Sequence, residues 1–349
     1  MAFLVDKARN AVAANFGHFA QSLSTHPFSL DETPDQSGKV AVVTGGSQGI
    51  GYGVSHTLLK HNIDKLFILS MSGDVVKGAK DAIAEEMGQE KADKTVWFQC
   101  DLGDWKRVKD VAEQIKDSTD RLDILVNNAG RGTMTYELTD YGVDRHMAVN
   151  HMGHVVLTSH LLPLMKKTAD KGSMVRIVNL SSNLHESVPS DVQFKSLQDL
   201  NQDLGAKYLY GRSKLAAILY ARYFDRNISK KGHSNIIMNA THPGIVSTNQ
   251  STQDIHEPYP LAGYGVSVGL EPFKKNQFEG AVSTIFAATT TTEGGQYICP
   301  PALPDAGSKL SQDESLGDDL MKLTREVVRE KTKAESVDQG CPMDDLVVA

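Results

Sequence analysis

One segment near residue 40 restricts the fold of this chain more than any other. In VAVVTGGSQGIGYGVSHTLLK an apolar run enters a turn and then an amphipathic stretch, with Gly45, Gly46, Gly49 and Gly51 in the turn. Glycine lets the backbone turn sharply and approach a phosphate group closely at the amino end of a helix. This order predicts the first unit of an α/β sheet with a dinucleotide site, and a plain tight turn is the alternative.

The same alternation of elements continues along the chain. Short β-branched runs occur at 40–44, 66–70, 95–99, 124–127, 175–180, 236–240 and 296–299, and helical stretches lie between them at 49–60, 74–88, 104–117, 140–167, 207–230 and 276–290. Strands that alternate with helices build a parallel sheet. We therefore expect an α/β fold over residues 38–300: a Rossmann-like, doubly wound, parallel, seven-stranded sheet with helices on both faces.

Three segments stand apart from this pattern. Residues 1–37 are interpreted as an N-terminal extension, in which an amphipathic helix precedes a polar segment at 31–38. Residues 247–275 are rich in proline, glycine and aromatic residues, and a loop of this length is typical of substrate binding. Residues 301–349 are expected to form a peripheral C-terminal tail.

Charge and composition exclude several classes of protein. A formal net charge of -7 argues against a nucleic-acid partner, which needs clustered basic residues. The three cysteines are far apart and fit neither a disulfide framework nor a zinc site. Since no apolar run approaches a membrane span and the start lacks the order of a secretory signal, we expect a cytoplasmic protein without an integral membrane span.

Two histidines raise the question of a metal ion. His151 and His154 lie three residues apart on a predicted helix, which is a possible spacing for metal ligands. No third or fourth ligand clusters near them in the sequence, so we predict no metal site.

Polar and small residues follow the third and fourth predicted strands. Asp101 comes just after the third strand, and Asn127, Asn128, Ala129 and Gly130 come at the end of the fourth. Ligands of an open parallel sheet bind above the carboxyl ends of its strands, so an acid there can bond an adenine and a small-residue turn can lie beside a cofactor. A helix cap and an ordinary turn are the alternatives.

A tyrosine and a lysine are placed for acid/base chemistry. Tyr210 and Lys214 lie four residues apart at the start of a predicted helix and share one helical face. An adjacent ammonium favours the phenolate form of tyrosine, which makes proton exchange with a substrate oxygen feasible. Ser181 and Ser182 end the preceding strand and can bond the same oxygen. A solvated helix face and a serine that caps a turn are the alternatives.

Together, the motifs TGGSQGIG, NNAG, NLSS, YGRSK and HPG make residues 38–300 resemble the short-chain dehydrogenase/reductase family. The resemblance implies that Tyr210 is the general acid/base and that Lys214 lowers its pKa and holds the nicotinamide ribose. It also implies that Ser182 orients the substrate carbonyl and that Asn150 belongs to a water-linked proton relay with the lysine. The long interval between Ser182 and Tyr210 departs from the family's pattern.

The resemblance also implies a set of cofactor-binding residues. They are Gly45, Ser47, Gln48, Gly49, Ile50, Gly51, Ser72, Asp101, Leu102, Asn128, Ala129, Gly130, Tyr210, Lys214, Pro243, Gly244, Ile245 and Thr248. The second strand ends in ILSMSGD, which offers neither an acid placed for the ribose of NAD nor a base for the 2′-phosphate of NADP. We favour NADP as the cofactor and keep NAD as the alternative.

The segments NLSS, HPGIVST and GGQYICP look most like retinol-dehydrogenase-like and protochlorophyllide-reductase-like members of the family. These branches favour apolar substrates, so we expect an apolar ketone, aldehyde or secondary alcohol, with lipid, terpenoid and polyketide intermediates of secondary metabolism as candidates. The resemblance further suggests a homodimer or homotetramer. A non-catalytic dinucleotide-binding regulator and a sugar-nucleotide epimerase are the alternative functions.

Overall fold

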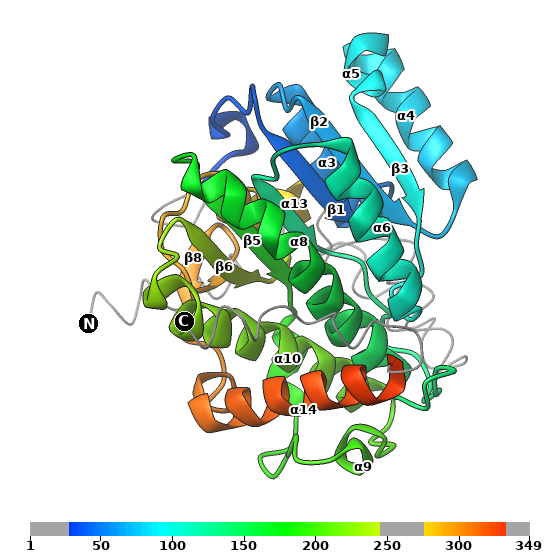
Figure 1. Cartoon of the computed structure of the whole chain (residues 1–349), viewed down its shortest axis with the longest axis vertical. Helices are drawn as coiled ribbons and strands as arrows, with labels where there is room; N and C mark the ends of the chain where they lie inside the picture. The colour runs from blue at the N-terminus through cyan, green and yellow to red at the C-terminus, as the bar shows by residue number, and fades with distance from the viewer. Residues whose placement is uncertain (1–27, 245–275, 333–349) are drawn as a thin grey trace.

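A computed structural model describes residues 28–244 and 276–332 of the chain. Within them, one eight-stranded sheet runs in the order β3-β2-β1-β4-β5-β6-β7-β8 (Figure 1). Neighbouring strands from β3 to β7 pair in parallel, and β8 is antiparallel to β7. The strands are β1 Val40–Thr44, β2 Lys65–Ser70, β3 Thr95–Gln99, β4 Ile124–Asn127, β5 Val175–Leu180, β6 Ile236–Thr241, β7 Tyr297–Cys299 and β8 Leu303–Asp305.

Helices cover both faces of this sheet, each over its own hydrophobic core (Figure 1). One face carries α6 Trp105–Ser118, α8 Gly153–Asp170 and α10 Ala206–Asn227. The other face carries α3 Gly49–Lys60 and α13 Gln277–Thr289, which pack against each other, and α4 Gly73–Met87 with α5 Gln89–Asp93 lies near the β3 edge. The expected Rossmann-like fold is therefore confirmed.

Local sequence explains why these elements form. Every residue of β1 is buried, as expected for a parallel strand with helices on both sides. On α6, Asp104 caps the amino end by accepting a hydrogen bond from the Arg107 amide, and Trp105, Val108 and Ile115 form its buried face. Such local signals place most elements within about two residues of their expected bounds.

The sheet has one strand more than the seven that the sequence predicted. The predicted strands appear as β1 to β7, and the count is wrong because the chain reverses after Cys299 and adds β8. β8 is short, and its central residue is Pro304. Proline is confined to the edges of sheets, so this segment gave little strand signal.

The fold also continues well past residue 300, where the sequence suggested a peripheral tail. Helix α14, Glu314–Thr332, packs along α10 (Figure 1). Its side chains Leu320, Met321 and Val328 are buried in the same core as those of α8 and α10. This helix is thus an integral layer of the domain rather than part of a peripheral tail.

Short elements complete the description. They are the helices α7 Arg145–Met147 and α9 Leu197–Leu200, the 3-10 turns at Leu30–Glu32, Asn183–Ser187, Ser229–Lys231 and Leu310–Gln312, and a π-helical turn at Ala148–Met152. None of the described helices is both long enough and apolar enough to cross a membrane. The predicted N-terminal helix and the substrate loop at 247–275 lie outside the described residues.

Candidate active site

The candidate site lies where the strand order reverses, between the carboxyl ends of β1 and β4. Thr44 ends β1, and its hydroxyl oxygen accepts hydrogen bonds from the amides of Asn128 and Ala129 at 2.9 Å each. The Asn128 side chain donates to the Thr44 carbonyl at 2.8 Å. A crevice at such a reversal is the usual ligand site of an open α/β sheet.

The glycine turn fits a ligand that needs a close backbone approach. Gly45 and Gly49 have φ of +64° and +53°, which other residues rarely adopt. A Cβ on Gly51 would lie 2.1 Å from the Gly45 carbonyl oxygen, so only glycine fits there. Gln48, the N-cap of α3, makes no side-chain cap, which leaves the first helical amides available to an anion.

Helix α10 brings the predicted acid/base pair to this crevice. The Lys214 side chain is buried, its Nζ donates to the Leu180 carbonyl at 2.9 Å, and Nζ lies 5.4 Å from the centre of the Tyr210 ring. The carbonyl sits at the end of β5, so the lysine is held from the sheet rather than from its own helix.

Asn150 lies in the π-helical turn before α8 and joins two segments around the site. Its Oδ1 accepts from the Arg131 amide at 2.6 Å, and its Nδ2 donates to the Arg131 carbonyl and to Ser213 Oγ at 2.9 Å each. Ser213 is the residue before Lys214, so Asn150 connects the loop after β4 to α10.

The two serines after β5 differ in their contacts. Ser181 lines the site, and its buried hydroxyl donates to the Lys214 carbonyl at 2.8 Å. Ser182 is half-buried; its hydroxyl accepts from the Leu184 amide at 3.2 Å and donates to Asn183 Oδ1 at 3.3 Å. The structure therefore places the predicted carbonyl-orienting Ser182 at the start of the Asn183–Ser187 turn, next to the cavity-lining serine.

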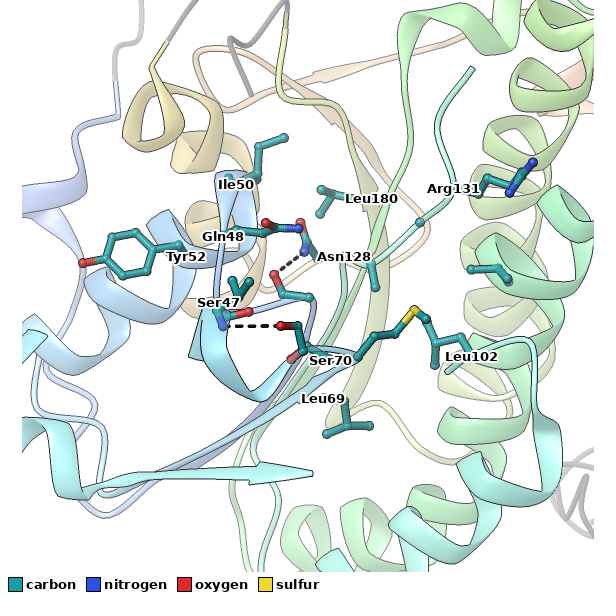
Figure 2. A pocket seen from close by; sticks show the side chains of 18 of the residues that line it. Ser47, Gln48, Ile50, Tyr52, Leu69, Ser70, Leu102, Asn128, Arg131 and Leu180 are labelled. Carbon is teal, nitrogen blue, oxygen red and sulfur yellow. Dashed lines mark hydrogen bonds between the residues drawn. The ribbon is translucent and has the colours of Figure 1, made fainter. Parts of the chain in front are cut away.

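Most of the predicted residues surround one cavity of about 1140 Å³. Figure 2 shows Ser47 and Ser70 on one side of it and Arg131 on the opposite side. Among the predicted residues, Gly51, Asn150, Ser182 and Gly244 are not part of its lining, and Ile245 and Thr248 lie outside the described residues. The predicted residues that line it are Gly45, Ser47, Gln48, Gly49, Ile50, Ser72, Asp101, Leu102, Asn128, Ala129, Gly130, Tyr210, Lys214 and Pro243.

Sequence reasoning missed two arginines in the cavity wall. Arg131 pairs with Glu137 at 3.0 Å, and Arg145 pairs with Glu137 at 3.3 Å and with Asp101 at 3.4 Å. The rim of the cavity therefore carries alternating negative and positive charges, in the order Asp101, Arg145, Glu137 and Arg131. The place of Arg131 in the cavity wall could have been suspected from the sequence, because this residue directly follows the NNAG motif. Arg145 lies in the wall only because the loop between the two residues folds back to the cavity.

Two reactive residue types near the site are held in neutral forms. Burial raises the pKa of the Cys100 thiol, which lines the cavity, to about 12, so it stays protonated. Burial lowers the pKa of His151 to about 3 and that of His154 to about 4. His151 bonds Thr324 on α14, while His154 bonds Thr44, so the two rings serve different neighbours. No cluster of metal ligands occurs among the described residues.

Comparison with known proteins adds independent information. Residues 39–258 match the family model described as short chain dehydrogenase. A protein of Neurospora crassa named as the mitochondrial oxidoreductase bli-4 is 61% identical over 99% of this chain and 84% of its own length. Mouse retinol dehydrogenase 14 is 32% identical over 75% of this chain and 77% of its own length.

A solved structure shares the fold at much lower sequence identity. The 3-oxoacyl (acyl-carrier-protein) reductase of Agrobacterium tumefaciens, with NADP bound, superimposes with a TM-score of 0.57. It is 21% identical and covers 75% of this chain and 93% of the reductase chain.

Proposed function

The chain belongs to the short-chain dehydrogenase/reductase family, and from this premise we propose that it moves hydride between NADP and an apolar ketone, aldehyde or secondary alcohol. It is an oxidoreductase of the retinol-dehydrogenase-like branch. The observation that carries the proposal is the meeting of the glycine turn with Tyr210 and Lys214 around one cavity. A pure binding protein could use the lysine to hold the cofactor but would have no need of the phenol beside it.

Three residues of the chain are proposed to act at the substrate oxygen, each with a different role. Tyr210 donates a proton to this oxygen during reduction and removes it during oxidation. The ammonium of Lys214, fixed by the Leu180 carbonyl, stabilises the phenolate that remains. Ser182 is proposed to hold the substrate oxygen by a hydrogen bond, which requires its hydroxyl to leave Asn183. NADP, when bound, supplies or accepts the hydride.

Residues from several segments around the crevice are proposed to hold NADP. We propose that the first amides of α3 hold its pyrophosphate, beside the turn from Gly45 to Gly51. Asp101, oriented by the Gly103 amide at 2.8 Å, is proposed to bond the adenine. The Asn128–Gly130 turn and Lys214 would hold the nicotinamide half, with Pro243 and the residues after it at the carboxamide.

The preference for NADP over NAD is proposed to depend on Ser72. This serine ends the β2 loop, lines the cavity and caps α4 by accepting from the Val75 amide. Because no acid follows β2 in the cavity wall, a 2′-phosphate meets hydroxyls rather than a like charge. The NADP bound to the bacterial reductase of similar fold is consistent with this proposal.

Substitution at position 72 tests the cofactor proposal. We expect Ser72→Arg to tighten NADPH binding about tenfold relative to NADH, because a guanidinium bonds phosphate strongly, and Ser72→Asp to reverse the preference. Fluorescence titration with both cofactors measures this ratio. Ser118→Arg is the matched control, since Ser118 is exposed and lies near the amino end of β2, away from the cavity. An unchanged ratio in both Ser72 variants would contradict the proposal.

The catalytic assignment is tested at Tyr210. We expect Tyr210→Phe to lower kcat at least about a hundredfold on apolar ketones and aldehydes, because the proton donor is lost, while NADPH still binds. The matched control is Tyr208→Phe, two residues earlier on the same helix, where the exposed ring should leave turnover unchanged. Tight NADPH binding without turnover of any substrate by the wild-type protein would favour a dinucleotide-binding regulator.

The retinol dehydrogenase supports an apolar substrate by its name, and we propose a lipid-like carbonyl or alcohol. A homodimer or homotetramer is also proposed, and the face of α10 that packs on α14 is not available to its interface. The predicted cytoplasmic location contrasts with the mitochondrial name of the 61% identical relative, so imaging of the tagged full chain is the direct test.

A further inference from the structure

His154 is a buried group in contact with the site for which the proposed chemistry gives no role. It lies one helical turn after Asn150 and is 3% exposed. Its Nε2 lies 2.9 Å from Thr44 Oγ1, at the end of β1, and its Nδ1 lies 3.1 Å from the Asn150 carbonyl oxygen. One imidazole therefore connects Thr44, the residue before the glycine turn, to the backbone of Asn150.

The hydrogen bonds around Thr44 define the form of this imidazole. The hydroxyl oxygen of Thr44 already accepts from the amides of Asn128 and Ala129, so its proton points at an acceptor. His154 Nε2, at 2.9 Å, is a nearer acceptor than the Val126 carbonyl, at 3.4 Å. Nδ1 then carries the ring proton and donates to the carbonyl of Asn150. Burial, with a smaller contribution from Lys214, lowers the pKa of His154 to about 4, so the ring is neutral at physiological pH.

The side chain of Asn150 connects this segment to α10, the helix that carries Tyr210 and Lys214. Asn150 lies in a π-helical turn, a form in which the regular hydrogen-bond ladder is interrupted. Its side chain bonds Ser213 Oγ, and Ser213 Oγ in turn donates to the Tyr210 carbonyl at 2.8 Å. Hydrogen bonds thus join β1 to the backbone of Asn150 through His154, and join the side chain of Asn150 to α10.

We propose that His154 is a positioning residue, which fixes Asn150 and through it the Tyr210–Lys214 pair relative to the coenzyme-binding turn. Without the imidazole, Asn150 would keep its side-chain bonds to Arg131 and Ser213 but lose the hydrogen-bonded link through His154 to Thr44 of β1. Misplacement of a reacting group by a fraction of an ångström slows the reaction more than it weakens ligand binding. The inference rests on the proposed oxidoreductase function.

The experiment compares two phenylalanine variants of one helix. His154→Phe keeps the ring shape and removes both hydrogen bonds, and we expect kcat to fall about tenfold while the dissociation constant of NADPH changes less than about twofold. His151→Phe is the matched control, because His151 is also buried on this helical segment. Its substitution likewise removes a hydrogen bond to a hydroxyl group, that of Thr324 on α14. It should keep the wild-type kcat. Thermal unfolding is recorded for each variant.

Conservative variants separate positioning from simple packing. His154→Asn and His154→Gln each retain one amide for one of the two partners, so their kcat should lie between those of His154→Phe and the wild type. They also provide the measurement should the phenylalanine variant fold poorly. Equal kcat losses in His154→Phe and His151→Phe, no loss in His154→Phe, or no recovery in both amide variants would overturn the inference. A wild-type protein without turnover would instead contradict the proposed function on which it rests.

Discussion

At the residue scale, the glycine turn after β1 can close only because Gly51 has no side chain. The nearest atom to a Cβ at this position would be the Gly45 carbonyl oxygen, which belongs to the backbone and cannot move aside as a side chain could. The next would be Asn128 Nδ2 at 2.5 Å, on the loop after β4. The glycine is thus needed for close packing between the turn and the loop after β4.

A methyl group at this position should disrupt both stability and binding. We expect Gly51→Ala to lower the free energy of unfolding by about 1–3 kcal/mol through overpacking, and to weaken NADPH binding more than about tenfold. Urea unfolding and fluorescence titration measure the two effects. The same substitution at Gly78, on exposed α4 with no atom within 4 Å of the added Cβ, should stabilise by about 0.5–1 kcal/mol and leave binding unchanged. Normal NADPH affinity in Gly51→Ala would refute this account.

At the scale of elements, α10 positions the active site and also organises the long segment before it. Between Tyr210 and Lys214, the helix carries Arg212, whose side chain is buried away from the cavity. Its guanidinium donates to the carbonyls of Asp199 and Leu200 at 2.8 and 2.6 Å. It also pairs with the buried carboxylate of Asp144 at 3.5 Å. The long interval between Ser182 and Tyr210 is therefore anchored to the catalytic helix.

Removal of this arginine should be costly because its partners are buried. We expect Arg212→Met to lower the free energy of unfolding by about 3–5 kcal/mol, since the Asp144 carboxylate loses its compensating charge. The matched control is Arg226→Met on the same helix, whose ion pair with Asp318 is half-exposed and should contribute at most about 1 kcal/mol. Urea unfolding of both variants gives the comparison. Similar losses in the free energy of unfolding of the two variants would contradict the expected effect of burying Arg212.

At the scale of the whole molecule, buried histidines make stability depend on pH. Burial lowers the pKa of His151 to about 3 and the pKa values of His154 and His160 to about 4. In the unfolded chain these side chains titrate near 6.5, as free histidines do. Between about pH 6.5 and 4 the unfolded state therefore binds protons that the folded state does not. The stabilisation is complete above this window and is lost as the pH falls.

The free energy of unfolding should accordingly decrease steeply from pH 7 to pH 4. Each of these histidines adds up to about 1.4 kcal/mol per pH unit to the slope within the window. Urea titrations at pH 7.5, 6.0 and 5.0 measure it. His160→Phe, which removes one titrating ring whose Nε2 has no hydrogen-bond partner in the described part of the chain, should flatten the curve. An equally steep curve in that variant would rule out the contribution of His160.

The parts of the structure that depend on local order can be predicted from the sequence alone. Strand and helix periodicity, the glycine turn and the spacing of Tyr210 and Lys214 all follow from neighbours along the chain, and β1 to β7 and α10 appear where they were predicted. The carboxyl ends of parallel strands meet at one edge of a sheet, so the cofactor motifs could be brought together before any coordinates were known.

Tertiary structure decided what depends on distant partners. The bridge from Thr44 to His154 joins residues 110 positions apart, and the contact of His151 with Thr324 joins residues 173 apart. The place of Arg145 in the cavity wall, the reversal that adds β8 and the burial of α14 are of the same kind. The direction of such a side chain is set by packing between elements, and no local pattern in the sequence records which neighbour the fold will bring to it.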